Sequence, residues 1–260
     1  MIYIIGGNGF VGSAITNVCN ERKYDCKIVT RENASCFNGT SCDVLINANG
    51  NSKKFMSNKD PLWDFDASVR GVRASLCSIK AKKYVHLSSC DVYPDCSSPE
   101  TTKEDCNLNV MEQSAYGFHK YLAEQCVMHS AEQWLIFRMG GFVGAGLKKN
   151  PIYDILNGGP LWLDSKSTLQ FINVKEAAEI ILDFALADEK KQIYNLCGNG
   201  LISLSEVIEA VEKPVEVKES APLVCYNVNI SKLLKKGQII NDTRSIVLKF
   251  VEEYKTATER

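Results

Sequence analysis

A tyrosine and a lysine four residues apart form the first pattern in this chain that could perform acid–base chemistry. Tyr116 and Lys120 stand in the run Tyr-Gly-Phe-His-Lys, and this spacing places both side chains on one face of a helix. A lysine ammonium beside a phenol favours the phenolate. The pair therefore predicts a tyrosine with a lowered pKa that can donate or accept a proton near neutral pH.

A serine after a strand-like run predicts a second reactive group. The run Tyr84–Ser88 leads directly into Ser89. The Ser89 hydroxyl is thus expected at the C-terminal end of a parallel strand, where α/β sheets bind their ligands. There it could share one substrate oxygen with Tyr116. The neighbouring Ser88 is the competing candidate.

A glycine-rich segment follows the first strand-like run, Ile2–Ile5. Gly6, Gly9 and Gly12 have the spacing G-x-x-G-x-x-G, and a helix is predicted after them. A tight turn there requires positive φ, and a missing Cβ lets the backbone approach a pyrophosphate at the helix N-terminus. The segment predicts a dinucleotide-binding loop. A purely structural turn is the alternative.

The end of the second strand-like run bears on which dinucleotide binds. An acidic residue normally holds the adenosine ribose hydroxyls of NAD at this place. Here Thr30 and Arg31 end the strand, and Glu32 only follows them. A small hydroxyl and a guanidinium suit a 2′-phosphate, so the sequence favours NADP(H) over NAD(H). Arg31 as an ordinary surface charge is the alternative.

The elements that must position these residues alternate between strand and helix over the first 140 residues. Helices are predicted at 11–19, 64–81 and 114–130, and strands at 2–5, 26–30, 43–47, 84–88 and 134–138. Such alternation is typical of βαβ units and a parallel sheet covered on both faces. Only about twelve residues separate the second and third strands, so one unit is expected to be shortened or lost.

The expected fold class is α/β, a Rossmann-like doubly wound parallel sheet with a smaller C-terminal substrate-binding part. Residues 1–145 are predicted to form the dinucleotide-binding domain, and a strand and helix around 168–187 to return to it. Residues 146–260 are predicted to be mainly substrate-binding, because glycine and proline punctuate short elements there.

Composition excludes several classes of protein. Of 260 residues, 30 are basic and 31 acidic, which gives no reason to expect nucleic acid as a partner. No apolar run approaches the ~18 residues that span a bilayer, and no signal peptide is expected before the first strand, so no membrane contact and a cytoplasmic location are expected. Eleven cysteines without a C-x-x-C pair, with three histidines, predict free thiols and no metal site.

Taken together, the motifs resemble the extended short-chain dehydrogenase/reductase family, in its sugar-nucleotide-modifying NAD-dependent epimerase/dehydratase branch. The resemblance covers most of the chain, in order. The matching segments are 6–12, Asp43–Ala48, Ser68–Val72, Val85–Tyr93, Tyr116 with Lys120, Phe137–Arg138, Gly144 with Gly146, Phe171–Ala177 and Ile230–Lys232.

This resemblance implies a role for each candidate residue. Tyr116 would be the catalytic acid/base, Lys120 would bind the nicotinamide ribose and tune Tyr116, and Ser89 would hydrogen-bond the reacting oxygen. The implied cofactor-binding residues are Gly6, Gly9, Phe10, Val11, Gly12, Thr30, Arg31, Ala48, Tyr116 and Lys120. Because family members commonly pair through helices that include the Tyr/Lys helix, a homodimer is also implied.

The chain departs from the family pattern where substrate would bind. Asp91 takes the place of a dehydratase's catalytic glutamate, and Cys90 cannot replace its acid, so a 4,6-dehydratase is disfavoured. Gly141 replaces a substrate-binding asparagine, and Leu169 replaces an arginine that binds the nucleotide diphosphate. The substrate-binding candidates are therefore Asp91, Gly141, Lys148, Lys149 and Gln170.

Three functions remain open from the sequence. The favoured one is an NADP(H)-dependent oxidoreductase that reduces a keto group on a sugar, most of all a keto-deoxy-sugar nucleotide. The first alternative is a sugar-nucleotide epimerase with tightly bound NAD, which would use the same three residues. The second is a non-catalytic nucleotide-sensing protein that keeps the fold. Cofactor identity separates the first two.

Overall fold

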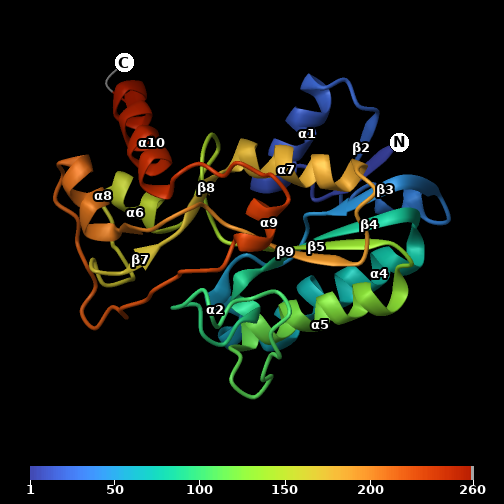
Figure 1. Cartoon of the computed structure of the whole chain (residues 1–260), viewed down its shortest axis with the longest axis horizontal. Helices are drawn as coiled ribbons and strands as arrows, with labels where there is room; N and C mark the ends of the chain where they lie inside the picture. The colour runs from blue at the N-terminus through green and yellow to red at the C-terminus, as the bar shows by residue number, and fades with distance from the viewer. Residues whose placement is uncertain (259–260) are drawn as a thin grey trace. The chain divides into compact units, whose positions relative to one another are not determined.

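The computed structural model describes residues 1–258 (Figure 1). These residues fall into two units that are each assembled from three segments. Unit 1 comprises Met1–Pro94, Glu104–Met139 and Lys175–Tyr194. Unit 2 comprises Asp95–Lys103, Gly140–Val174 and the chain from Asn195 onward. The chain therefore returns to unit 1 through α7 after passing through unit 2.

A six-stranded sheet in the order β2-β1-β3-β4-β5-β9 is the scaffold of unit 1. The strands are β1 (Ile2–Ile5), β2 (Cys26–Val29), β3 (Ser41–Asn47), β4 (Lys80–Ser89), β5 (Trp134–Met139) and β9 (Gln192–Leu196). Strand β1 pairs in parallel with β2 and β3, and β4 pairs in parallel with β3 and β5. The predicted parallel α/β sheet is confirmed.

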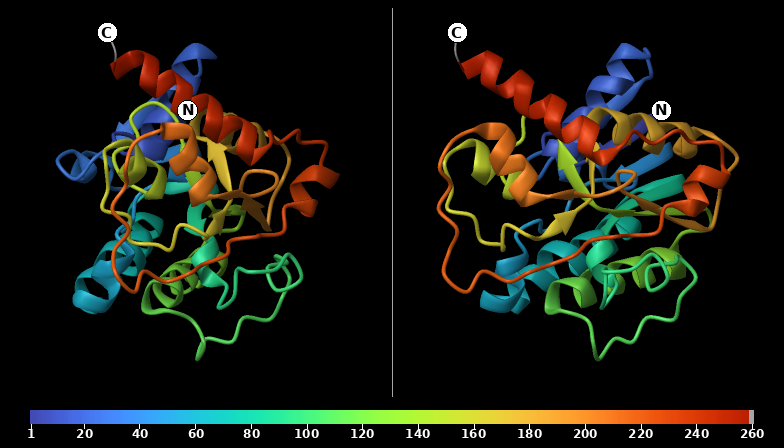
Figure 2. Two further views of the ribbon diagram at one scale, coloured as in Figure 1. Left: turned by 90° about the vertical axis from the view of Figure 1, so that its left-hand side faces the viewer. Right: turned by 60° about the vertical axis from the view of Figure 1, so that its left-hand side comes forward.

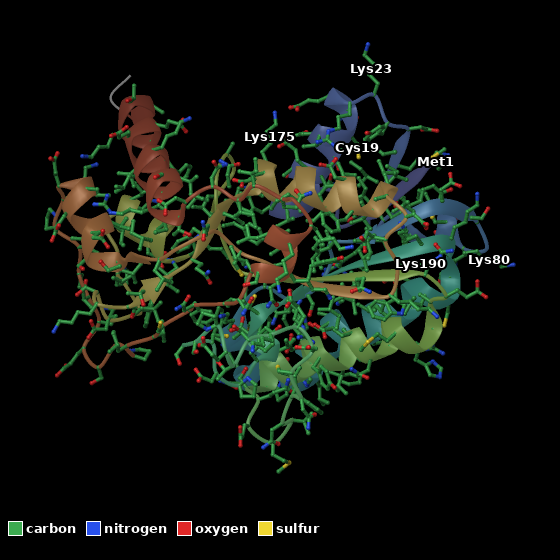
Figure 3. All side chains as sticks on the ribbon, viewed as in Figure 1. Met1, Cys19, Lys23, Lys80, Lys175 and Lys190 are labelled. Carbon is green, nitrogen blue, oxygen red and sulfur yellow. The ribbon has the colours of Figure 1, made fainter. Side chains whose placement is uncertain are left out.

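Helices cover both faces of this sheet (Figure 1). Helices α1 (Phe10–Glu21) and α7 (Val174–Leu186) lie on one face, where Lys175 of α7 and Cys19 of α1 appear on the same side (Figure 3). An ion pair of 2.8 Å joins Lys175 to Glu21 there. Helices α4 (Gly71–Ser78) and α5 (Ala115–Ser130) pack apolar residues on the other face. The doubly wound arrangement follows from these two layers.

The link between β2 and β3 is shortened, as the spacing predicts. It holds only a single 3₁₀ turn, η1 (Ala34–Phe37), where a crossover helix would otherwise lie. The Phe37 ring packs edge-on against Tyr3 of β1 with the ring centroids 5.0 Å apart. The Phe37 side chain thus covers a part of the sheet that a crossover helix would otherwise cover.

The segment after β3 is more broken than the single helix predicted over 64–81. Helices α2 (Lys54–Lys59) and α3 (Pro61–Phe65) lead into a π-helical turn, η2 (Asp66–Arg70), and then into α4. Asp60 caps α3 by accepting the Trp63 N–H at 3.0 Å, and Pro61 fits its first turn. The predicted C-terminal end of the helix is wrong, because β4 begins at Lys80.

In its described part, unit 2 contains two small strand pairs and four helices. The last of these helices, α10, is drawn in red in Figure 2. Strand β6 (Gly141–Val143) pairs in parallel with β8 (Phe171–Asn173), and β7 (Thr168–Leu169) pairs antiparallel with β10 (Ile202–Ser203). Its helices are α6 (Pro151–Leu156), α8 (Leu204–Val211), α9 (Ser231–Lys235) and α10 (Thr243–Thr258). Apolar residues of α6, α8 and α10 pack with β6 and β8 into one core.

Three further observations concern the chain as described. Within residues 1–258, no helix is long and apolar enough to cross a membrane. The same residues contain no group of three or more potential metal-ligating side chains. The eleven cysteines, all of which lie in this range, form no disulfide, and Cys19, Cys42, Cys90 and Cys197 are buried.

Candidate active site

The turn from β1 to α1 can be formed only with glycine at two of its positions. Gly6 has φ +77°, a left-handed conformation that side chains rarely adopt. A Cβ on Gly12 would lie 2.1 Å from the Gly6 carbonyl oxygen. The turn is closed by the Gly9 N–H, which donates to the same oxygen at 2.9 Å. The predicted tight turn is present, and α1 begins directly after it.

The surroundings of this turn fit the pyrophosphate of a nicotinamide dinucleotide. A Cβ on Gly6 would lie 3.1 Å from the Ala48 carbonyl oxygen, so the ends of β1 and β3 lie side by side. Strand β2 lies on one side of β1 and β3 on the other, which is the switch point where such sheets bind ligands. No side chain caps α1 at Gly9, so its first N–H groups can receive an anion.

The residues after β2 form a tight loop. The Thr30 N–H donates to Asn33 Oδ1 at 2.7 Å, and Asn33 Nδ2 donates back to the Ile28 carbonyl at 3.1 Å. A hydrogen bond from the Thr30 side chain lowers the pKa of the Glu32 carboxyl. Arg31 is exposed. The carboxylate of Glu32 is thus engaged by its own loop, while Arg31 extends into solvent.

A glycine in α5 brings the tyrosine helix close to the serine strand. Ser114 begins the helix by accepting the Gly117 N–H at 3.1 Å. A Cβ on Gly117 would lie 2.0 Å from the Asp91 carbonyl oxygen, which no larger residue could allow without displacement. Gly117 follows Tyr116 in sequence and Asp91 closely follows Ser89. This contact therefore sets Tyr116 beside the end of β4.

The three predicted catalytic residues are brought together in unit 1. The Tyr116 hydroxyl donates to the Asn51 carbonyl oxygen at 3.1 Å, and the Ser89 side chain lies within hydrogen-bonding reach of it. Lys120 Nζ lies 5.4 Å from the centroid of the Tyr116 ring. A Cβ on Gly50 would be only 2.9 Å from that nitrogen, so Lys120 runs beside the segment that follows β3.

The pKa of Tyr116 differs from the sequence prediction. Burial raises this pKa above its ordinary value, and the Asp91 carboxylate raises it further, against the opposing effects of Lys54 and Ser89. The lowered pKa that the Tyr116/Lys120 spacing predicts is therefore contradicted. Lys120 Nζ lies over the Tyr116 ring, and the effects of burial and of Asp91 exceed those that lower the pKa.

The Ser88 hydroxyl belongs to a different hydrogen-bond network from that of Ser89. Its hydroxyl donates to Glu124 Oε1 at 2.6 Å, inside a buried cluster where Arg138 forms an ion pair of 2.8 Å with Glu124. Arg138 also donates to the Tyr93 hydroxyl at 2.9 Å. Since successive residues of a strand face opposite sides, Ser89 is the serine that faces Tyr116.

Asp91 is held between Ser89 and a lysine that the sequence analysis did not single out. The Ser89 hydroxyl donates to Asp91 Oδ2 at 2.8 Å, and Lys54 Nζ contacts Asp91 Oδ1 at 2.6 Å. Asp91 therefore lies beside the catalytic candidates of unit 1, which agrees with its position after Ser89. Lys54 lies 37 residues earlier in the chain, and no motif marks it.

A buried carboxylate beneath the site was also missed. Asp64 accepts hydrogen bonds from Asn51 Nδ2 at 2.8 Å and Ser68 at 3.1 Å, and its Oδ2 lies 2.7 Å from His119 Nδ1. Burial works to raise the pKa of Asp64, but the hydrogen bonds outweigh it and lower the pKa. Asp64 thereby fixes Asn51, whose carbonyl accepts the Tyr116 hydroxyl. Ser68, one helical turn after Asp64, was the only nearby residue in the sequence that could have indicated a partner for this carboxylate.

The remaining substrate-binding candidates, Gly141, Lys148, Lys149 and Gln170, lie in unit 2. A Cβ on Gly141 would lie 2.7 Å from the Gln170 carbonyl oxygen, so this position cannot carry a side chain. Gln170 is buried: its amide accepts the Val228 N–H at 2.6 Å and donates to the Gly198 carbonyl at 3.1 Å. This amide supports two loops, and its substrate role stays a prediction. Lys148 and Lys149 are exposed.

Comparisons with known proteins agree with this geometry. A model of the "NAD dependent epimerase/dehydratase family" matches residues 2–197. Among curated proteins, none matches the chain significantly.

Solved structures share the fold at low sequence identity. MoeE5 in complex with UDP-glucose and NAD is 14% identical with a TM-score of 0.82, covering 100% of this chain and 99% of its own. UDP-glucose 4-epimerase of Thermus thermophilus in complex with NAD is 18% identical, with a TM-score of 0.74 and 98% of each chain covered. RMD from Pseudomonas aeruginosa with NADPH is 16% identical, with a TM-score of 0.78, covering 98% of this chain and 99% of its own.

Proposed function

The chain belongs to the NAD dependent epimerase/dehydratase family, and from this premise we propose that it reduces a keto group on a sugar nucleotide with NADPH. As a family member it is a nicotinamide-dependent enzyme of the extended short-chain dehydrogenase/reductases. The proposal adds the direction of the reaction, the cofactor and the class of substrate.

The environment of the Tyr116 hydroxyl supports the direction of the reaction. Its hydroxyl donates to the Asn51 carbonyl, and burial together with Asp91 raises its pKa above the ordinary value. A protonated phenol can give a proton to a developing alkoxide but cannot take one. Reduction requires a proton donor in its first turnover, whereas oxidation requires a base.

Each residue of the site then has one task. When bound, the reduced nicotinamide supplies a hydride to the carbonyl carbon. Tyr116 delivers the proton to the carbonyl oxygen, and the Ser89 hydroxyl, held beside the phenol, orients that oxygen. Lys120, fixed against Gly50, holds the ribose of the cofactor. The turn at Gly6 and Gly12 receives the pyrophosphate.

The substrate class and the cofactor rest on separate observations. MoeE5 and the Thermus epimerase are solved with NAD, and RMD with NADPH, so similar folds accept either dinucleotide. MoeE5 is also solved with UDP-glucose, which supports a nucleotide sugar as substrate class. The exposed Arg31 and the engaged Glu32 favour the 2′-phosphate of NADPH.

A direct assay tests the proposal. Purified protein is denatured and any released nucleotide is identified, and the protein is then supplied with NADPH and a panel of UDP- and dTDP-4-keto-sugars. Oxidation of NADPH with formation of a hydroxyl sugar supports the reductase. Stoichiometric NAD⁺ in the released fraction, with interconversion of two sugar epimers, contradicts it and supports an epimerase, which the similarity to UDP-sugar 4-epimerases makes the second candidate.

Replacing Arg31 with alanine is expected to weaken NADPH binding by about 10–100-fold and to leave NADH binding unchanged. The guanidinium would lose charge-assisted hydrogen bonds to the 2′-phosphate, worth about 1.5–3 kcal/mol. Fluorescence titration with each cofactor measures both constants. Lys27→Ala, which removes an exposed cation from β2 itself, is the matched control. Equal weakening for NADH would refute the assigned role of Arg31.

We also propose a homodimer that forms through α5 and its neighbours in unit 1. A surface cavity of about 460 Å³ exposes mainly apolar atoms, and its lining includes Phe65, Val69, Leu122 and Cys126. Phe65 in this lining is exposed, and so is Phe118, four residues before Leu122 on α5. Apolar surface of this kind marks protein–protein contact.

Leu122→Asp is expected to convert the dimer into a monomer, because it places a charge in the middle of this apolar face. Sedimentation velocity across micromolar concentrations measures the change. Leu186→Asp, at an exposed leucine of α7, should leave the dimer intact. A wild-type protein that sediments as a monomer at all concentrations excludes this interface.

A further inference from the structure

We propose that Ser89, Asp91 and Lys54 form a proton relay that reloads Tyr116 from solvent. This inference rests on the proposed reduction, because it concerns the proton that the reduction consumes. It assigns a task to Lys54, which no motif marks, and to Asp91, whose role the family pattern leaves open.

The four polar groups lie in a row, each within hydrogen-bonding reach of the next. The Ser89 hydroxyl donates to Asp91 Oδ2 at 2.8 Å and can turn to the Tyr116 phenol, which lies within its reach. Asp91 Oδ1 lies 2.6 Å from Lys54 Nζ. These two separations are those of ordinary and charge-assisted hydrogen bonds, short enough for a proton to pass from Lys54 to Asp91 and from Asp91 to Ser89.

Exposure to solvent increases along this series. Tyr116 and Ser89 are each 8% exposed. The side chain of Asp91 is 13% exposed, and that of Lys54 is 56% exposed. The reacting phenol therefore lies inside unit 1, while the far end of the series is in contact with water. A series with this gradient can carry a proton between a buried group and solvent.

The local fold imposes the arrangement of Ser89 and Asp91. Ser89 caps the 3₁₀ turn η3 (Cys90–Val92) by accepting the Asp91 N–H at 3.2 Å. This turn folds the Asp91 carboxylate back onto the serine that precedes it by two residues. The close packing of Gly117 on the Asp91 carbonyl then fixes the turn against α5. Lys54 reaches the carboxylate from the first residue of α2.

The proton balance is closed by solvent. In the reduction, the Tyr116 O–H bond breaks and an O–H bond forms on the substrate. The Tyr116 phenolate then takes the proton of the Ser89 hydroxyl. Ser89 is reprotonated through Asp91 by the Lys54 ammonium, and water or a buffer acid reprotonates Lys54. One solvent proton is consumed in each turnover, and no other reactant is needed.

The charges around Tyr116 favour transfer in this direction. Asp91 in η3 and Asp64 in α3 raise the pKa of Tyr116, on top of the effect of burial, while Lys54 in α2 lowers it. Lys120 of α5 lies over the ring face. These effects together raise the pKa of Tyr116, so its phenolate is a stronger base than that of an ordinary tyrosine and readily takes up a proton.

Single-turnover kinetics in weakly buffered solution test the relay. NADPH oxidation is followed by its absorbance, and proton uptake by a pH indicator, for the wild type, Asp91→Asn and Lys54→Met. The first substitution keeps the size of the side chain, and Lys54 is exposed, so at least the second variant should fold normally. Lys53→Met, at the exposed neighbouring lysine, is the matched control.

The relay predicts that the two signals coincide in the wild type and in Lys53→Met. In Asp91→Asn and Lys54→Met, the rate of proton uptake should be about tenfold or more below the rate of NADPH oxidation. This loss is a part of the 10²–10⁴-fold rate increase that a positioned proton donor contributes. Imidazole buffer should remove the lag, which a merely structural defect would not allow. A wild type that reduces keto-sugars while both variants show no lag overturns the relay alone. A wild type that reduces none overturns the reductase and the relay together.

Discussion

Replacing Tyr116 with phenylalanine is expected to lower kcat for keto-sugar reduction by about 10²–10⁴ while KM for the sugar nucleotide and the dissociation constant for NADPH stay nearly unchanged. The substitution removes only the hydroxyl, which donates to the Asn51 carbonyl and lies within hydrogen-bonding reach of Ser89. The ring would still fill its buried place. What is lost is the proton that the transition state requires.

Steady-state kinetics and cofactor titration on the same preparation measure this effect. Tyr121→Phe, on the same helix, is the matched control and should retain wild-type kcat. A Tyr116→Phe variant with unimpaired turnover would contradict the assignment of Tyr116 as the acid. If that variant also retained all biological activity of the protein, the sensing alternative from the sequence would be supported instead.

Replacing Glu124 with glutamine is expected to cost about 3–5 kcal/mol of stability, because it leaves the Arg138 charge buried without its counter-ion. Both side chains are buried, and Arg138 donates to Glu124 through Nε at 3.1 Å and through a terminal nitrogen at 2.8 Å. Burial works to lower the pKa of Arg138, but the charge and hydrogen bonds of Glu124 raise it above its ordinary value. Because an arginine does not lose its proton in proteins, the guanidinium stays charged when its partner is removed.

Thermal unfolding measures the loss, which should appear as a decrease in Tm of roughly 6–20 °C. The exposed pair Asp66–Arg70, 3.4 Å apart, provides the contrast, since Asp66→Asn should change stability by less than about 1 kcal/mol. Similar shifts for the two variants would mean that Arg138 gains water or another partner when Glu124 is neutralised.

Much of the scaffold could be predicted because its signals are local. Short apolar runs mark β1 to β5, and the shortened link before β3 follows from the number of residues available. The turn at Gly6 and Gly12 is predictable for the same reason, since its geometry depends on a few adjacent residues. The Tyr116/Lys120 pair follows from helical spacing alone.

The electrostatics of the site could not be predicted, because they depend on contacts between distant segments. Asp64 reaches His119 across 55 positions, and Lys54 reaches Asp91 across 37. The pKa of Tyr116 differs from the sequence prediction for this reason. Helical spacing places Lys120 on the same helix face, but it does not reveal that burial and Asp91 raise the pKa of the hydroxyl.

The hydrogen bonds of Gln170 could not be predicted from the sequence for the same reason. Its amide partners, Gly198 and Val228, lie 28 and 58 residues further along the chain. No local pattern around Gln170 indicates that its side chain would join these two loops.

The interrupted course of the chain through unit 1 has a consequence during synthesis on the ribosome. Strand β5 ends at Met139, yet its neighbour β9 begins only at Gln192, about fifty residues later. At translation rates of about 5–20 residues per second, the outer edge of β5 waits roughly 3–10 s for its partner. During that interval a nascent chain presents an unpaired parallel edge of buried residues, the kind of surface that recruits chaperones or seeds aggregation. Slower elongation between β5 and β9 is therefore expected to lower the yield of folded protein.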